Sequence, residues 1–406
     1  MTKPSLNQST ENADLSTLTP AMRQFIEIRT EVAKQHPNIL LLYRMGDFYE
    51  TFFEDAVEIN RLLGITLTSR GKGKPDAIPM AGVPFMTLDS YLARLVKLGK
   101  SVGIVEQIGD PAAVKGTMPR KLVRIVTPGT ITEDELLPAK ADAALIAVCP
   151  PSGKKSPQWS VVSLVLSSGA FKGFCCTEDE LPGEIARISP QEILIPDSCR
   201  ETAKSFSGAA QLTPLPDWHF DPKHGTDELL HHFNMENLDA WAVSEKPGVL
   251  AAAGAILGYV EQTQVDAVPH IRPLVFEESS RFVGLDPSSR RNLELTEPLR
   301  SENGPTLFST IDHCHTSMGS RMLRSWITQP LRDPTVPRAR HEAVREMIEN
   351  ESLRDALSEP LKNLPDLERV ASRIALGSVR PRELSGLRDA LPALQRLSEA
   401  AALSRV

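Results

Sequence analysis

The segment Arg44-Met45-Gly46-Asp47-Phe48-Tyr49-Glu50 places two large aromatic residues and an acid directly after a glycine turn. Phe48 and Glu50 are two residues apart, so their side chains point to the same side if the segment is extended. The exposed ring can then stack on a nucleic-acid base while the carboxylate tests the hydrogen-bonding edge of that base. Stacking is worth ~1–3 kcal/mol per base, and wedging a side chain into a duplex costs a few kcal/mol per unstacked step. That cost is lower at a mispaired base, so the pair is suited to finding a defect in a duplex.

Two other interpretations of these residues remain open. Most aromatic side chains are buried, and Phe48 would then begin a core face that Phe52-Phe53 completes. Alternatively, Asp47, Glu50 and Glu54 share one face if the segment is helical, where they would hold Mg²⁺ for a metal-dependent nuclease. Acids are also common in the first turn of a helix because of its dipole, which gives the carboxylates a purely structural explanation.

The charge of the chain is unevenly distributed. The formal net charge is −7, which by itself argues against a nucleic-acid partner. Residues 1–130, however, carry a net charge of +3 and the remainder −10. Two stretches of the first third, Arg70 to Lys74 and Lys115 to Arg124, are basic without local acids. We therefore expect a local cationic surface that the total charge hides.

Composition disfavours several classes of protein. The chain has 406 residues, of which 41% are hydrophobic and 24% charged, enough for several folded domains. Its longest apolar run, residues 249–260, is shorter than the ~18 residues of a membrane span, and residues 1–16 show no signal-peptide core. The five cysteines include no CxxC pair, which favours a reducing compartment.

Two further motifs are weak. A phosphate-binding loop needs the pattern Gly-x4-Gly-Lys-Ser/Thr, and Gly99-Lys100-Ser101 supplies only its end, because Arg94 stands at the position of the first glycine. Asp312-His313-Cys314-His315 contains three metal-ligating residue types but lacks the four-ligand spacing of structural zinc. We expect a polar helix segment there.

The elements that must position the first motif alternate between helices and strands, which predicts an α/β domain over the first third. Gly46-Asp47 should turn the chain, and a helix that buries Phe52 to Leu63 should follow. The other elements expected there are a helix from Thr19-Pro20 to His36-Pro37, a helix from Thr87 to Gly99, and strands over residues 39–43, 101–105 and 122–126.

A second α/β unit follows the Pro138 region, and helices dominate from about residue 300. In the second unit we expect a hairpin of residues 159–166 and 170–176, helices over 178–188 and 249–260, a strand over 192–195 and a loop over 214–225. The helical part contains amphipathic stretches at 339–348 and 367–376 and a further helix that starts at Arg380, and the chain ends inside this pattern.

The motifs taken together resemble one known family. Phe48-Tyr49-Glu50 within LLYRMGDFYETFFEDA strongly resembles the mismatch-reading motif of the bacterial MutS family of DNA mismatch repair proteins. Segments that resemble the same family follow in order as IPMAGVP (78–84), EQIGDP (106–111), RIVTPGT (124–130), RRNLEL (290–295), MGSRML (318–323) and Arg380-Pro381-Arg382. The resemblance thus extends over nearly the whole chain beyond residue ~20.

The resemblance implies a multidomain α/β plus α protein. Its expected parts are a disordered N-terminal tail (1–18), a mixed α/β mismatch-binding domain (19–132), a ribonuclease-H-like α/β connector (133–275) and the incomplete start of an all-α core domain (276–406). Because the ribonuclease-H-like fold also holds nuclease sites, the fold alone does not assign function, and we find no clustered acids on the predicted connector strands.

The resemblance also implies roles for individual residues. Phe48 would wedge into the minor groove and stack on the mispaired base, and Glu50 would hydrogen-bond that base. The expected DNA-lining residues are Met45, Arg70, Pro79, Met80 and Arg120, the last of them at backbone phosphate. The pair Phe85-Met86 departs from the Tyr-His of many relatives; it should still pack, without the polar contact of the histidine.

For the whole protein the resemblance implies a homodimer in the bacterial cytoplasm, associated with the nucleoid, which binds mismatched or looped double-stranded DNA and a MutL-type partner. ATP and Mg²⁺ would bind a separate C-terminal ATPase domain and drive formation of a sliding clamp. The chain as given is expected to hold no catalytic residue, cofactor, metal or membrane segment and not to be an enzyme. Two rival hypotheses are the metal-dependent nuclease and a truncated product with folded domains but no useful affinity for DNA.

Overall fold

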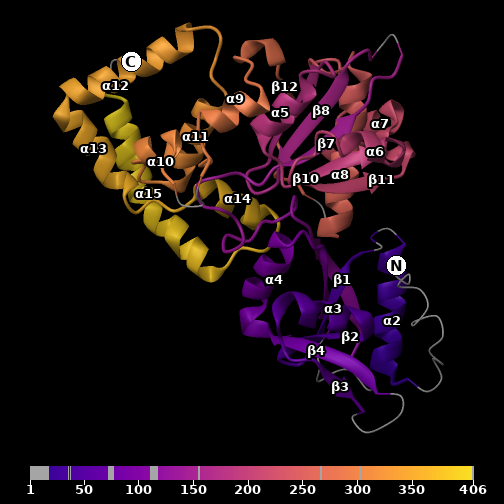
Figure 1. Ribbon diagram of the computed structural model, residues 1–406. Coiled ribbons are helices and arrows are strands. Elements are labelled where there is room, and N and C mark those ends of the chain that lie inside the picture. Colours follow the sequence, from indigo (N-terminus) through magenta and orange to yellow (C-terminus); the bar gives the residue numbers. More distant parts are fainter. Residues whose placement is uncertain are drawn as a thin grey trace. The chain divides into compact units, whose positions relative to one another are not determined.

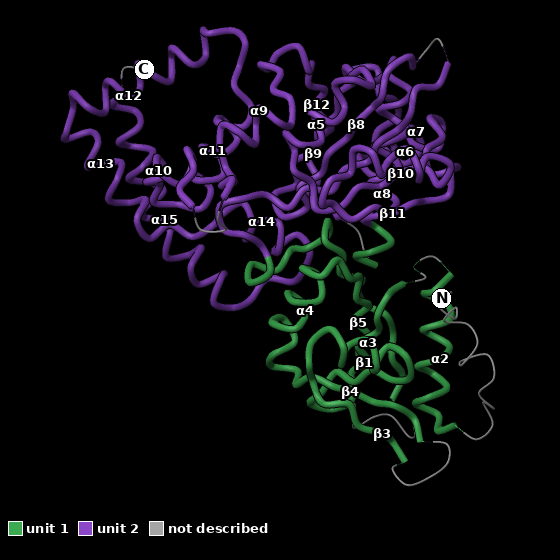
Figure 2. The backbone as a smooth tube through the Cα atoms, in the orientation of Figure 1, with its two compact units in different colours: residues 1–136, 261–267 green, residues 137–260, 268–406 purple. Residues whose placement is uncertain are grey.

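The computed structural model describes residues 18–404 except residues 35, 37, 72–76, 110–117, 154–155, 266–267 and 301–303. The chain divides into two compact units, which Figure 2 distinguishes by colour. Unit 1 comprises residues 1–136 and 261–267, and unit 2 comprises residues 137–260 and 268–406. The tail predicted at residues 1–18 lies outside the described residues except for Leu18.

Unit 1 is built on a six-stranded mixed sheet with the strand order β3-β4-β2-β1-β5-β6. Its strands are β1 (Leu40–Met45), β2 (Phe48–Phe52), β3 (Thr68–Arg70), β4 (Ile78–Pro84), β5 (Val102–Gln107) and β6 (Arg120–Val126). Its helices are α2 (Pro20–Ala33), α3 (Phe53–Leu63) and α4 (Leu88–Lys97). Strand β1 pairs antiparallel with β2 and parallel with β5. The predicted α/β domain is therefore present.

Helix α2 packs on one face of this sheet, and Figure 1 shows α4 on the opposite side. Phe25 of α2 meets the rings of Tyr43 and Phe52 edge to face, at centroid distances of 5.6 and 5.1 Å. A buried ion pair of 3.1 Å between Arg29 and Asp55 joins α2 to α3. These contacts hold β1 and β2 against α2.

The segment after the Gly46-Asp47 turn differs from the prediction. Residues 48–52 form β2, and the helix begins only at Phe53. The reason is tertiary, since β2 is inserted between β1 and β4 and pairs with both. Asp47, Glu50 and Glu54 therefore do not share a helical face, so the arrangement that the nuclease hypothesis needs does not form. Among the described residues there is no group of three or more side chains that could hold a metal ion.

Unit 2 begins with a second six-stranded sheet, in the order β11-β10-β7-β8-β9-β12. Its strands are β7 (Leu145–Cys149), β8 (Trp159–Val165), β9 (Ala170–Cys176), β10 (Glu192–Pro196), β11 (Gln211–Leu215) and β12 (Val275–Phe276). The first three strands form an antiparallel meander, and β10 and β11 continue it in parallel beside β7. In order of appearance this arrangement is 3-2-1-4-5, which is the predicted ribonuclease-H-like topology.

Alternation along β7 divides the unit 2 core into two layers. Leu145, Ala147 and Cys149 pack toward the apolar helix α8 (Pro247–Gln264), and Ile146 and Val148 pack toward α5 (Leu181–Ile188). Both faces of the sheet are thus covered, which is why these strands read as continuous hydrophobic runs. The helices α6 (Arg200–Ala203) and α7 (Pro222–Phe233) complete this part.

The loop predicted over residues 214–225 is wrong. Its first residues end β11, a 3-10 helix follows over Asp217–Phe220, and α7 begins at Pro222. Asp221 caps α7 by accepting hydrogen bonds of 2.9 Å from the backbone N–H groups of Lys223 and His224. The Asp and Pro residues that indicated a loop are the start signals of a helix.

Helices α7 and α8 cross with their backbones in contact. A Cβ atom at Gly254 would lie 2.3 Å from Gly225 Cα, and one at Gly225 would lie 2.2 Å from the Leu250 carbonyl oxygen. We expect Gly254→Ala to lower the stability of unit 2 by ~1–3 kcal/mol, because the two helices must separate. The measurement is the midpoint of thermal unfolding. The matched control is Gly258→Ala in the same helix, where an added Cβ would meet no described atom within 4 Å apart from its chain neighbours and the nearby backbone of its own helix. An equal loss there would contradict the explanation.

The remainder of unit 2 is helical, as predicted. Its helices are α9 (Pro287–Asn292), α10 (Leu307–Ile311), α11 (Ser317–Thr328), α12 (Thr335–Glu349), α13 (Glu351–Leu361), α14 (Leu367–Ala375) and α15 (Pro381–Ala401). Residues 312–315, predicted to be helical, instead connect α10 to α11. Asp312 accepts hydrogen bonds there from Ser320 Oγ (2.9 Å) and Lys140 Nζ (2.6 Å). No helix in the described part of the chain has the length and apolarity to cross a membrane.

Candidate nucleic-acid interface

The β1–β2 turn presents Phe48 at the end of the sheet. Gly46 adopts a left-handed backbone conformation with φ of +61°, and the next pair places Met45 opposite Phe48. The Phe48 side chain is 47% exposed, whereas Tyr49 and Phe52 of the same strand are buried. Phe52 lies in the core beneath α2, and Phe48 lies four residues earlier, at the start of the strand. The interpretation of Phe48 as a core residue is therefore wrong.

Glu50 lies between Phe48 and the core on the same face of β2. Its neighbours across the sheet are Tyr43 on β1 and Gly82 on β4. The carboxylate is half-buried, and its Oε2 atom has no hydrogen-bond partner among the described residues. Burial raises the pKa of Glu50, while the charges of Arg70 and Arg120 oppose the rise. The site therefore combines an exposed ring with a buried acceptor atom that no described group uses.

Strand register places most of the predicted DNA-lining residues on the face of Phe48. Residues that pair directly point to the same side, and alternate residues along a strand share a face. Met45 pairs with Phe48 and Met80 with Phe52, so both lie on this face. Arg70 pairs with Ile78, which is two residues from Met80 and shares its face. Pro79 alternates with Met80 and lies on the opposite face.

Arg120 reaches the same face from the edge strand β6, but much of its guanidinium is bound within the chain. Its Nε donates to the Arg44 carbonyl oxygen at 2.8 Å, and one terminal nitrogen donates to the Met118 carbonyl oxygen at 3.0 Å. The other terminal nitrogen lies 3.3 Å from Met45 Sδ, and Cζ lies 4.9 Å from the centre of the Tyr43 ring. Arg120 thus holds Met45 and supplies positive charge near Glu50. Of the two predicted basic stretches, Lys72, Lys74 and Lys115 lie outside the described residues, whereas the four arginines and lysines that remain are described: Arg70, Arg120, Lys121 and Arg124.

A cluster of side chains on the face of the sheet opposite Phe48 was not predicted from the sequence. Arg44 pairs with Tyr49 on the face opposite Phe48, and its Cζ lies 3.8 Å from the centre of the Phe85 ring. Phe85 stacks on Tyr49 at 6.1 Å, and the Tyr49 hydroxyl donates to Glu106. We call Arg44, Tyr49, Phe85 and Glu106 the turn-support cluster. The signal that could have found it is the mirrored spacing of Arg44 and Tyr49 about Gly46-Asp47, which pairs them only in a hairpin.

The expected packing of Phe85-Met86 holds for one residue of the two. Phe85 packs against Arg44 and Tyr49 in the turn-support cluster. Met86 is 87% exposed. Position 86 therefore carries an apolar side chain in contact with solvent.

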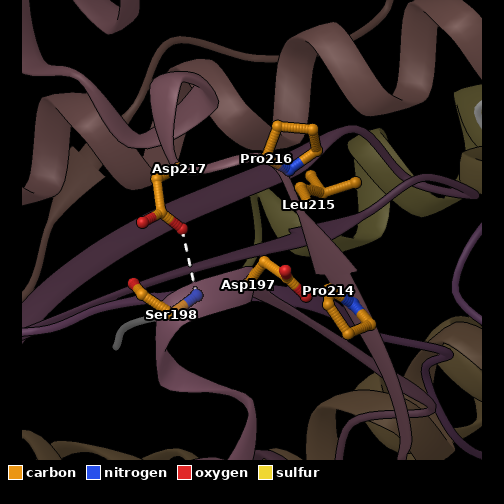
Figure 3. A pocket seen from close by; sticks show the side chains of 6 residues that line it. All are labelled: Asp197, Ser198, Pro214, Leu215, Pro216 and Asp217. Carbon is orange, nitrogen blue, oxygen red and sulfur yellow. Dashed lines mark hydrogen bonds between the residues drawn. The ribbon is translucent and has the colours of Figure 1, made fainter.

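Unit 2 contains an open hollow of about 510 Å³ at the carboxyl ends of β10 and β11 (Figure 3). It is lined by Asp197, Ser198, Pro214, Leu215, Pro216 and Asp217. Asp217 Oδ1 accepts a hydrogen bond of 3.1 Å from the Ser198 backbone N–H, so this carboxylate caps the adjoining loop. None of the predicted DNA-contacting residues lines the hollow.

Comparison with protein families accounts for this domain order. Models of three consecutive domains match the chain: MutS domain I over residues 19–135, MutS domain II over residues 143–272 and MutS domain III over residues 288–405. A mixed α/β domain, a ribonuclease-H-like domain and a helical region in this order define a multidomain protein of the α/β plus α class. The chain belongs to the MutS family. Membership implies mismatch recognition in DNA mismatch repair, with DNA as the partner.

Proposed function

We propose that Phe48 and Glu50 perform the recognition step. Phe48 enters the minor groove at a mispaired base and stacks on it, Glu50 hydrogen-bonds that base, and the duplex bends. The observation that carries this proposal is the exposed Phe48 ring, on the same strand face as the unpartnered Glu50 Oε2. An aromatic side chain this exposed next to a half-buried carboxylate contributes little to the core.

Affinity and discrimination would come from different parts of the surface. Arg70 and the other cations of the first third supply salt-dependent attraction to phosphate, which carries no sequence information. Met45 and Met80 offer apolar surface beside Phe48, and Pro79 contributes through the backbone of β4. Arg120 acts mainly through its charge near Glu50. Discrimination follows from deformability, since a mispaired step kinks more cheaply than a paired one.

Family membership supports further proposals for the whole protein. The mismatch-binding, connector and core domains would meet at the boundaries 132/133 and 275/276. A homodimer in the cytoplasm would bind ATP and Mg²⁺ in a further domain, convert to a sliding clamp at a mismatch, and recruit a MutL-type partner through its other domains.

Incubation of the chain with Mg²⁺ and labelled duplexes tests the recognition proposal. We expect a mobility shift that is stronger for a duplex with one mismatch than for the matched duplex of the same sequence, with both DNA strands intact. Cleavage of the DNA would instead support the nuclease, and equal weak shifts on both duplexes would support a folded chain without useful affinity. Adding EDTA in a parallel lane serves as the control, because wedge insertion needs no metal ion whereas the nuclease does.

A further inference from the structure

The turn that presents Phe48 is supported from the opposite side of the sheet. Arg44 lies on the face away from Phe48, since it pairs with Tyr49 and Tyr49 alternates with Phe48. Its Nε donates to the Gly46 carbonyl oxygen, and its guanidinium lies over the Phe85 ring. The Phe85 backbone N–H in turn donates to the Asp47 carbonyl oxygen at 2.8 Å. Both residues of the turn are therefore held by the turn-support cluster.

The cluster is also tied to the middle of the sheet. The Tyr49 hydroxyl donates to Glu106 on β5, two strands away in the order β2-β1-β5. Tyr49 is buried, and burial followed by the Glu106 carboxylate raises its pKa, so the phenol keeps its proton. A planar guanidinium suits this position because it stacks on a ring and donates in the plane at the same time. The cation and the two rings thus form a rigid backing for the turn.

From this geometry we propose that Arg44 is a positioning residue for Phe48, which acts by fixing the β1–β2 turn and does not bind DNA phosphate. The inference rests on the proposed recognition function. When the Phe48 ring wedges between stacked bases, the bases exert a force on the ring and therefore on the turn that presents it. If that turn yields, part of the stacking energy is lost to its reorganisation. Preference for a mismatch then falls, while attraction to phosphate on any duplex is unchanged.

The variants Arg44→Lys and Arg44→Met distinguish a role of Arg44 in fixing the turn from a role of its positive charge in binding phosphate. Lysine keeps the positive charge but loses the planar stacking and the Nε bond, and methionine keeps only the aliphatic stem. In both we expect the ratio of matched to mismatched Kd to fall about fivefold or more. The matched-duplex Kd should change by less than about twofold, with the slope of log K against log salt unchanged. Phe85→Leu should reproduce the loss, and the pair Arg44→Lys with Phe85→Leu should be non-additive.

The measurement is fluorescence anisotropy over a salt series, together with 2-aminopurine placed beside the mismatch, whose fluorescence rises when the wedge unstacks it. Arg61→Met is the control, because it removes an exposed arginine of unit 1 that lies outside the turn-support cluster and pairs with Glu58 at 2.8 Å. Equal weakening on both duplexes in Arg44→Met, with a slope smaller by about 0.9 and rescue by lysine, would assign Arg44 to phosphate instead. An unchanged ratio in both variants would also overturn the inference.

The proposed function is checked in the same experiment with the unaltered chain. If that chain prefers the mismatch and only the Arg44 variants behave contrary to expectation, the inference on Arg44 fails alone. If the unaltered chain shows no preference, the recognition proposal and the inference fail together. Thermal unfolding of each variant, compared with that of Phe85→Leu, shows whether any loss follows from a destabilised domain.

Discussion

Replacing Phe48 with alanine is expected to remove most of the preference for mismatched over matched duplex and to leave the fold intact. The ring is 47% exposed, so its loss opens no cavity in the core. Stacking on one base is worth ~1–3 kcal/mol, which corresponds to a fall in the Kd ratio of about 5- to 150-fold. Affinity for matched duplex should change little, because phosphate contacts supply it. The measurement is the pair of Kd values on two duplexes that differ at one position.

The control for Phe48→Ala lies in the same strand. Phe52 is on the same face, four residues on, and is fully buried in the core that contains Phe25 and Tyr43. We expect Phe52→Ala to cost ~3–5 kcal/mol of stability through the cavity that it leaves. Thermal unfolding should therefore shift strongly for Phe52→Ala and hardly for Phe48→Ala. A collapsed transition in Phe48→Ala would restore the interpretation of Phe48 as a core residue.

Glu50→Gln is expected to tighten binding to matched duplex and to shrink the mismatch preference. A half-buried carboxylate near DNA is repelled by phosphate and loses solvent on binding, and a mispaired base compensates by hydrogen-bonding to it. The amide carries no charge and has the same shape. We expect matched-duplex affinity to rise by about three- to tenfold, which corresponds to ~1 kcal/mol. Equal losses of affinity on both duplexes would contradict this role.

Titration of the Glu50 carboxylate should make both the stability of the fold and the affinity for matched duplex depend on pH. Burial raises the pKa of Glu50 above its ordinary 4.5, despite the opposing charges of Arg70 and Arg120. The folded chain therefore holds this proton more tightly than the unfolded chain, so this group stabilises the fold less as pH rises through the window above 4.5. For binding, matched-duplex affinity should rise as pH falls into that window. Glu50→Gln should lose this component, and an identical pH profile in both proteins would exclude Glu50 as its source.

Local signals predicted many elements of the fold. Thr19-Pro20 marks the start of α2, Gly99 follows α4, and the alternating segments on either side of Gly169 form the β8–β9 hairpin. Strand β2 was missed because it runs directly into the helical spacing of Phe53, Ala56 and Ile59, and because the strand β4 that pairs with it lies about 30 residues away in the chain. Residues 214–225 were misassigned because helix start signals resemble those of a loop.

The part of the candidate site that depends only on side-chain periodicity within one strand could be predicted from the sequence. The two-residue spacing of Phe48 and Glu50 fixes a shared face once the segment is extended. Which of Pro79 and Met80 shares the face of Phe48, and the pairing of Arg44 with Tyr49, depend on strand register, which comes from the pairing of β2 with its neighbours. The bonds that hold Arg120 to Arg44 and Met118 likewise appear only in three dimensions.

Strand β2 passes from the core to the exposed end of the sheet within five residues, and its side chains alternate in direction. Insertion or deletion of one residue between Phe48 and Phe52 would reverse one of them, so either the reading ring would turn to the back of the sheet or the core would lose Phe52. The orientation of Phe48 and that of Phe52 are therefore fixed by the same alternation of side chains along β2. Transfer of this recognition element to another scaffold therefore requires the whole β1–β2 hairpin together with the turn-support cluster. Residues 48–50 alone do not determine to which face of a sheet their side chains point.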